Sequence, residues 1–199
     1  MDKTPDWFDQ LVQCLRYLPG VGPRSAERLA YHLLKTRERS QYFAHVLAQT
    51  LTHMQQCERC NHYTQTPVCA RCDNKHRDPH LLCVVEQPHD LLAIEQSEGF
   101  SGGFYVLMGR ISPLDGIGPE ELNFSRLVKR IKEEAISEVI LALSPTVEGQ
   151  TTMNCIQTLL SNHPIRLTQL AQGIPLGGEL ASLDGFTIAN AIRNRALLS

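Results

Sequence analysis

The 199-residue sequence has no long apolar run, and nothing in it approaches the 18 consecutive apolar residues typical of a membrane-spanning helix. Its first ten residues, MDKTPDWFDQ, lack the apolar stretch of a signal peptide. Internal repeats and low-complexity segments are absent as well. We therefore expect a cytoplasmic protein with no membrane partner.

The phosphate-binding pattern GxxxxGK[ST] is also missing. A glycine-rich stretch, IPLGGELASLDG, lies near the end of the chain, but it contains no lysine. ATP binding is therefore not expected. The glycines of this stretch better suit turns and close packing between subunits.

The composition is ordinary for a soluble globular protein, with 42% hydrophobic residues and a net charge of −2. The charge is unevenly spread, because residues 1–80 carry 11 basic and 8 acidic side chains while residues 81–199 carry 8 and 13. Between residues 10 and 45, 6 basic side chains face only 2 acidic ones. Such a local surplus favours a polyanionic partner, although charged helix faces are more often merely solvated.

The stretch LPGVGPRSAERLAYHLL, from residue 18, interrupts a helical pattern. Four helix-breaking residues crowd into its start: Pro19, Gly20, Gly22 and Pro23. A helix start at Thr4-Pro5-Asp6 precedes it, and a further helical stripe from Phe43 to Met54 follows. Glycine permits the positive φ that ends a helix and proline can begin the next one. The pattern predicts a helix–hairpin–helix.

This hairpin would leave backbone N–H groups uncovered at the start of its second helix. Together with the positive end of the helix dipole, these groups form a phosphate-sized site. Arg24 and Arg28 stand one helical turn apart beside it. We therefore predict that Gly20, Gly22, Arg24 and Arg28 contact the DNA backbone, reading phosphates rather than sequence. The alternative is a turn used only for packing or dimerisation.

Four of the seven cysteines, Cys57, Cys60, Cys69 and Cys72, form a C-x2-C-x8-C-x2-C pattern. Two such pairs can place four thiolates tetrahedrally around a structural Zn²⁺ ion. Disulfides are the alternative, which a reducing compartment disfavours.

Two histidines are rival metal ligands, but His62 or His76 would each have to displace a better-spaced cysteine. The other three cysteines, Cys14, Cys83 and Cys155, have apolar neighbours and are expected to be small core residues.

Beyond residue 80 the pattern changes to alternating strands and helices. Short apolar runs predict strands at 81–85, 104–108 and 138–143. Helical patterns cover 89–96, 123–135, 151–161 and 186–195. This alternation predicts an α/β fold with a central parallel or mixed sheet covered on both faces.

These motifs together resemble the RecR family of bacterial recombination mediators, and the similarity covers essentially the whole chain. It rests on the hairpin, the four-cysteine finger, VVEQP, LMGRISPLDGIGPEEL, SPTVEG and IPLGGELASLDG, in that order. The resemblance implies four parts: a helix–hairpin–helix region (1–56), a zinc finger (57–72), a Toprim domain (80–175) and a C-terminal oligomerisation segment (176–199).

The resemblance also implies a function. Members of this family load recombinase onto single-stranded DNA at gaps, act with RecO and RecF, and assemble from dimers into tetrameric rings that can encircle DNA. We accordingly expect a noncatalytic DNA-binding scaffold. A protein-binding adaptor without DNA contact is a further reading, which the hairpin arginines disfavour.

The main alternative is a magnesium-dependent Toprim nuclease or topoisomerase-like enzyme. Enzymes with this domain use a glutamate after the first strand and a DxD motif after a later one. Glu86 matches the first, but Ser144 and Thr146 stand where the two aspartates would be. Glu148 and a loop residue, Asp115, are the remaining carboxylates, and they make a poor two-metal site.

Glu148 has a different role by resemblance, as a contact for RecO. The motif here reads SPTVEGQ, where the family typically has NPTVEGE, so one carboxylate of that surface is lost. The alternative role of Glu148 is local, because a carboxylate near a helix N-terminus contributes roughly 0.3–1 kcal/mol. The two roles are compatible.

Overall fold

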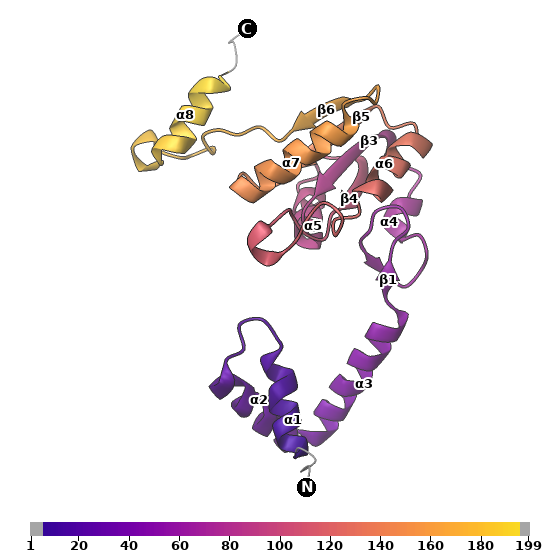
Figure 1. Ribbon diagram of the computed structural model, residues 1–199, viewed down its shortest axis with the longest axis vertical. Coiled ribbons are helices and arrows are strands. Elements are labelled where there is room, and N and C mark those ends of the chain that lie inside the picture. The colour runs from indigo at the N-terminus through magenta and orange to yellow at the C-terminus, as the bar shows by residue number, and fades with distance from the viewer. Residues whose placement is uncertain (1–5, 196–199) are drawn as a thin grey trace. The chain divides into compact units, whose positions relative to one another are not determined.

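The computed structural model describes residues 6–195 and divides the chain into two compact units between Met54 and Gln55 (Figure 1). Among the described residues, no helix is both long and apolar enough to cross a membrane.

The N-terminal unit consists of three helices, α1 (Trp7–Arg16), α2 (Pro23–Lys35) and α3 (Arg37–His53). Asp6 caps α1 by accepting a hydrogen bond from the Phe8 amide. The predicted helix start at Thr4 and Pro5 lies outside the described residues. The helix–hairpin–helix arrangement itself is confirmed.

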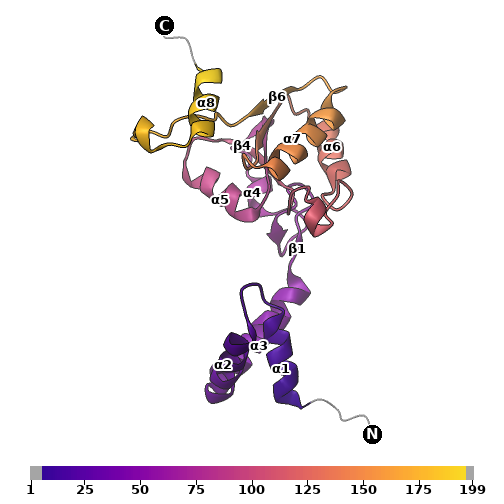
Figure 2. The ribbon, with the colours of Figure 1, turned by 60° about the vertical axis from the view of Figure 1, so that its left-hand side comes forward.

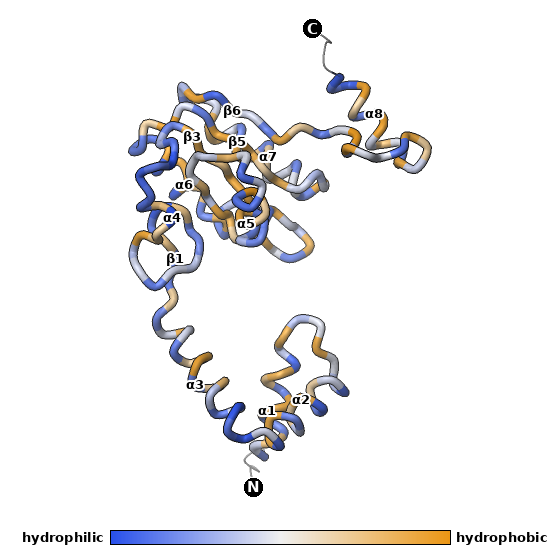
Figure 3. Tube along the Cα trace, turned by 180° about the vertical axis from the view of Figure 1, so that it is seen from behind, coloured by the Kyte–Doolittle hydropathy of each residue, from blue (hydrophilic) through white to orange (hydrophobic). Residues whose placement is uncertain are grey.

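Few side chains are buried in this unit. Helix α1 packs on α2, where the rings of Phe8 and Tyr31 lie 4.8 Å apart between centroids. Of the described residues in the unit, only Ala26 and Ala30 are buried. Figure 3 shows hydrophobic stretches along all three helices, yet most of these side chains remain partly exposed. Cys14, predicted as a core residue, is exposed instead, along a groove that it lines with Leu11 and Phe43.

The second unit begins with a small finger, in which β1 (Gln55–Gln56) pairs antiparallel with β2 (Tyr63–Thr64) and α4 (Ala70–Asp73) follows. A four-stranded sheet comes next, formed by β3 (Asp78–Val85), β4 (Gly102–Val106), β5 (Glu138–Ala142) and β6 (Arg166–Gln169). The strand order is β4-β3-β5-β6 and all neighbours run parallel. The predicted α/β class with a parallel sheet is confirmed.

Helices cover both faces of this sheet (Figure 2). On one face, α6 (Phe124–Glu133) and α7 (Val147–Leu160) pack through Leu127, Ile131 and Ile156 on strand residues such as Leu82 and Leu141. On the other face, α5 (Pro88–Gln96) places the buried Leu91 on Val85 and Val106. After β6 the chain continues to α8 (Gly185–Arg193).

Several predicted boundaries were wrong. The strand predicted at 104–108 ends at Val106, and Met108 has a positive φ of 63°. The helix predicted at 151–161 begins at Val147, because Thr146 caps it by accepting a hydrogen bond from the Gly149 amide. Strand β6 was not predicted, since its sequence, RLTQ, has no apolar run.

Candidate metal centre and nucleic-acid interface

The hairpin turn joins α1 and α2 through a few backbone hydrogen bonds. The Val21 amide donates to the Leu18 carbonyl at 3.1 Å, and the Ala26 amide donates to Gly22 at 2.9 Å. Gly20 has φ +79°, a conformation that side chains rarely adopt. Pro23 begins α2, as predicted. The sequence forms a sharp turn here because Gly20 allows the positive φ and Pro23 suits the first position of a helix.

Gly22, unlike Gly20, needs no conformation special to glycine. Its φ is −79°, which any residue can adopt. A Cβ atom built on Gly22 meets no atom within 4 Å. Because Gly22 has no side chain, the start of α2 stays open to an approaching nucleic acid backbone.

Arg24 and Arg28 lie in the first turns of α2, and both are exposed. Among the described residues neither guanidinium has a hydrogen bond or ion pair, and no acidic residue occupies the first turn of α2. The turn thus combines two free cations with the positive end of a helix. Such an arrangement suits the phosphates of a nucleic acid backbone.

The four cysteines of the finger gather into one cluster. Their sulfur atoms all lie within 4.8 Å of one another, and Sγ of Cys60 lies 3.6 Å from Sγ of Cys69. Four sulfurs at Zn–S distances of about 2.3 Å would stand about 3.8 Å apart in a tetrahedron, so the donor set and spacing fit structural zinc. All four are free thiols, and three of them are buried. Among described residues this is the single metal-suited cluster, and no histidine belongs to it.

The clustered thiols shift one another's pKa values. A hydrogen bond from Cys72 lowers the pKa of Cys60 to about 5, and the same pair raises the pKa of Cys72. Burial and the neighbouring sulfurs also raise the pKa of Cys69, so the thiols of the cluster oppose one another's ionisation. A bound cation would relieve this conflict, because it deprotonates its thiol ligands.

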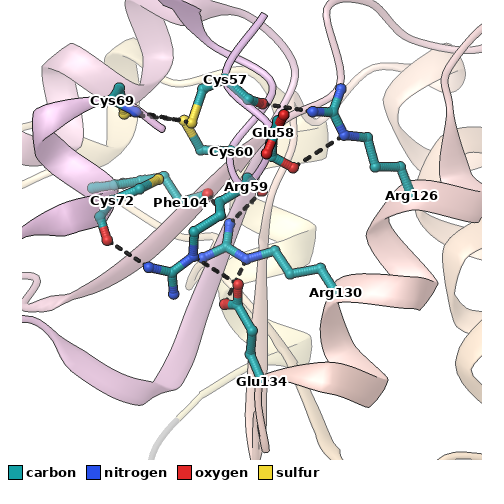
Figure 4. Close-up of polar contacts among 10 residues, drawn as sticks. All are labelled: Cys57, Glu58, Arg59, Cys60, Cys69, Cys72, Phe104, Arg126, Arg130 and Glu134. Carbon is teal, nitrogen blue, oxygen red and sulfur yellow. Dashed lines mark hydrogen bonds and ion pairs between the residues drawn. The ribbon is translucent and has the colours of Figure 1, made fainter. Parts of the chain in front are cut away.

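Helix α6 holds the finger by its backbone (Figure 4). Arg126 donates to the carbonyls of Cys57 at 2.8 Å and Glu58 at 3.1 Å. Arg130 donates to the carbonyl of Arg59 at 2.9 Å. The finger is thereby fixed to the four-stranded sheet on its α6 side.

Two arginine–glutamate–arginine groups add ionic contacts between the finger and the helices that cover the sheet. Glu134 pairs with Arg59 of the finger at 2.7 Å and with Arg130 at 2.8 Å. Glu95 of α5 pairs with Arg71 of the finger at 2.9 Å and also contacts Arg77. The hydrogen bond from Arg71 lowers the pKa of Glu95. At Glu134 burial raises the pKa, but the hydrogen bonds from Arg59 and Arg130 outweigh it and lower the pKa overall.

The lowered carboxylate pKa values predict a loss of stability in acid. A carboxylate whose pKa is lower in the folded than in the unfolded state stabilises the fold. This contribution is fully present above the unfolded pKa, about 4.3 for glutamate, and is lost as the pH falls through the folded-state pKa. We therefore expect Glu134→Gln to lower the Tm at neutral pH, and the difference from wild type to shrink below about pH 4. Thermal unfolding across pH 3–7 measures this.

Glu133→Gln is the matched control for that experiment, because Glu133 lies on the same helix but is exposed and makes only a 3.8 Å pair with Lys129. If the Tm difference between wild type and Glu134→Gln stays constant down to pH 3, the lowered pKa of Glu134 is contradicted.

The carboxyl end of β3 leads into Glu86, the glutamate that the sequence offered as a metal ligand. Its side chain is buried and accepts from the Ser144 amide at 2.8 Å and the Ser144 hydroxyl at 3.0 Å. Arg110 lies 3.6 Å from the same carboxylate. A Cβ at Gly149 would lie 2.0 Å from the Ser144 carbonyl, so only glycine fits beside this contact. Glu86 thus joins the ends of two strands.

The other acidic candidates do not join Glu86 in a cluster. Asp115 lies in an exposed loop turn and accepts a hydrogen bond from the Ser112 hydroxyl at 2.7 Å. Glu148 lies in the first turn of α7, half-buried, with no ion pair among the described residues. Ser144 and Thr146, which replace the Toprim aspartates, instead bind Glu86 and cap α7.

Sequence reasoning missed the residues that hold the finger, among them Asn61 and the α6 arginines. One signal was available, because Arg130 falls within the apolar stripe of Leu127 and Ile131, where a charged residue must find buried partners. Asn61 carried no such signal.

Family models match three parts of the chain. They describe a RecR helix-hairpin-helix (residues 8–54), a Toprim domain (80–171) and a RecR C-terminal region (173–196). The fold and sites thus define a Toprim protein with a helix–hairpin–helix and a four-cysteine finger.

Full-length relatives make the assignment narrower. The chain is 51% identical over 197 residues to a Recombination protein RecR of Legionella pneumophila, covering 98% of this chain and 99% of the relative. A Recombination protein RecR of Acinetobacter baylyi is 48% identical, with 96% of each chain covered. One of Psychrobacter cryohalolentis is 47% identical, over 96% of this chain and 98% of the relative. The chain belongs to the RecR family.

Proposed function

We propose that this chain is a noncatalytic DNA-binding scaffold of recombinational repair, which loads recombinase at single-stranded gaps together with RecO and RecF. The observation that carries the proposal is the pair of free arginines, Arg24 and Arg28, beside the open turn at Gly20 and Gly22. Full-length likeness to recombination proteins supports it. Exposed, unpaired cations at a helix start argue against an adaptor that never meets DNA.

Assembly is the second part of the proposal. One hairpin offers a small, phosphate-directed contact that is weak at physiological salt. Several hairpins in one assembly bind more tightly through effective concentration. We therefore propose self-association up to a ring-shaped clamp on single-stranded and duplex DNA.

The N-terminal unit offers a surface for this assembly. A groove of about 660 Å³ lies among its three helices, lined mainly by Leu11, Leu15, Leu33, Phe43 and Leu47. Exposed apolar area of this kind suits contact with a second copy. The C-terminal segment 176–199 is proposed to contribute too, since Leu176, Leu180 and Phe186 are exposed there.

The mass of the protein in solution, with and without DNA, tests the assembly. Sedimentation or light scattering should give a multiple of 22.3 kDa, and DNA should stabilise the larger form. A monomer under all conditions, binding DNA with unchanged affinity, would overturn the clamp.

The four-part division is proposed along with the function: residues 1–56 for DNA, 57–72 for zinc, 80–175 for partners and 176–199 for assembly. Structural Zn²⁺ is the metal we propose for the cysteine cluster, held by Cys57, Cys60, Cys69 and Cys72.

The enzyme alternative would need Glu86 to bind a metal ion. Its two oxygens already accept from Ser144 and pair with Arg110, which supports a structural role. A cleavage assay on supercoiled and nicked DNA with Mg²⁺ separates the two. Cleavage that Glu86→Gln abolishes would favour the enzyme.

Glu148→Ala is expected to weaken binding to RecO while leaving the fold and oligomeric state intact. The side chain has no ion pair to lose among the described residues, so its removal should lower the free energy of unfolding by no more than the helix-dipole contribution, roughly 0.3–1 kcal/mol. Titration calorimetry with RecO measures the effect. Glu133→Ala, on exposed α6 surface, is the charge-matched control. Equal affinities for both variants and wild type would refute the contact.

A further inference from the structure

The finger also covers an edge of the Toprim sheet. Among the described strands, β4 lies at an edge of the sheet and pairs with β3 alone. Its sequence, GGFYV, has no charge and no proline, so its outer backbone groups could template pairing with another chain. At the opposite edge, β6 is a polar four-residue strand that starts with Arg166, and such edges resist pairing.

The outer groups of β4 at Val106 bind the finger. The Val106 amide donates to the Cys60 carbonyl at 2.9 Å, and Nδ2 of Asn61 donates to the Val106 carbonyl at 2.7 Å. Cys60 belongs to the metal cluster. The same residue thus offers its sulfur to the metal and its carbonyl to the sheet.

The next two outward carbonyls along β4 accept from arginines. Arg130 donates to Phe104 at 2.6 Å, and Arg77 donates to Gly102 at 2.8 Å. The outward carbonyls of Gly102, Phe104 and Val106 therefore all accept from side chains outside the sheet. Asn61 of the finger, Arg130 of α6 and Arg77, just before β3, together take the place of a fifth strand.

The conformation of Asn61 depends on the cysteine loop. Asn61 is only 1% exposed and has φ +65°. Its amide donates to the Cys57 carbonyl at 3.0 Å, and its Oδ1 accepts from Arg126 at 3.3 Å. Asn61 directly follows Cys60, and its amide binds Cys57. Whatever fixes the sulfurs of these two cysteines therefore also directs the Asn61 side chain at β4.

We propose that the cysteine finger is a cap for the β4 edge, with Asn61 as the positioning residue that links metal loading to a closed edge. When the metal leaves, β4 opens and pairs with β4 of a second copy of this chain. This inference does not depend on DNA binding or on any partner.

Asn61→Gly tests the link, because glycine keeps the positive φ and removes only the side-chain bonds. The variant should still bind one Zn²⁺ per chain. It loses the bond from Asn61 to the Val106 carbonyl, which holds the finger against β4, while the bond from the Val106 amide to Cys60 is left to open with the edge. Hydrogen exchange at the Val106 amide should therefore be faster by about tenfold or more, because the lost buried hydrogen bond no longer opposes that opening. Asn123→Gly is the matched control, since Asn123 also has positive φ, at 50°, but its side chain makes no capping bond. The control should exchange like wild type.

Chelation of the wild-type protein provides a second measurement that needs no variant. Removal of zinc should raise exchange at Val106 before it does so at Val139 and Leu141 of the inner strand β5, and should produce dimers and larger species. Equal exchange in Asn61→Gly and wild type would overturn the proposal. So would simultaneous exchange of β4 and β5 on chelation, which indicates global unfolding.

Discussion

Cys57→Ser is expected to abolish stoichiometric zinc and to lower the solubility and Tm of the protein before any DNA-specific property changes. The reason is that metal affinity in such a site is folding energy, with apparent values of about 10–16 kcal/mol in zinc-finger peptides. Cys57 is fully buried, and its sulfur also accepts a hydrogen bond from the Cys69 amide at 3.3 Å. Metal analysis and thermal unfolding of the same preparations measure the effect, and Cys72→Ser should behave alike.

Cys155→Ser is the control, because this thiol is only half-buried on α7 and lies outside the metal cluster. It should keep its zinc and most of its stability. A metal-free protein that melts at the wild-type temperature would show that the cluster does not depend on a metal.

Arg24→Ala combined with Arg28→Ala is expected to weaken DNA binding nearly uniformly across sequences. Each lost phosphate contact should reduce the slope of log affinity against log salt by about one on duplex DNA, because fewer counterions are released. Since neither side chain has an ion pair among the described residues, the Tm should stay close to wild type. Salt-titrated binding curves measure the slope. Lys35→Ala, at the other end of α2, removes one charge without touching the turn and is the control.

Two further variants separate the turn from the assembly. Gly22→Val should hinder the approach of a phosphate while both arginines remain, and its φ of −79° predicts little strain. A variant held as a monomer should bind far more weakly despite an intact hairpin. Equal affinities and slopes for wild type, the double-arginine variant and the monomer would show that the turn is only a packing device.

Local patterns in the sequence predicted the elements that depend on local chemistry. Gly20 and Pro23 define the turn, and the apolar runs of β3 and β5 locate the sheet core, because these signals require no distant partner. The cysteine cluster was predictable for the same reason, since its spacing nearly fixes the geometry.

Features that arise from tertiary contacts were not predictable. Strand β6 is polar and forms only because β5 offers a neighbouring edge. Glu86 was a candidate metal ligand until the fold placed Ser144 against it, 58 residues further along the chain. Asn61 contacts Val106, which lies 45 residues further along the chain, and no local pattern predicts that contact.

The scarcity of buried residues in the N-terminal unit has a consequence for how this unit unfolds. A unit in which Ala26 and Ala30 are the only buried residues described has little apolar burial to offset the conformational entropy of three helices. If copies of the chain complete its packing, the stability of these helices follows mass action rather than sequence alone. Dilution would then loosen the helices that carry Arg24 and Arg28 while the Toprim sheet, with its own core, stays folded. The strength of DNA binding would in that case report how much of the protein the cell contains.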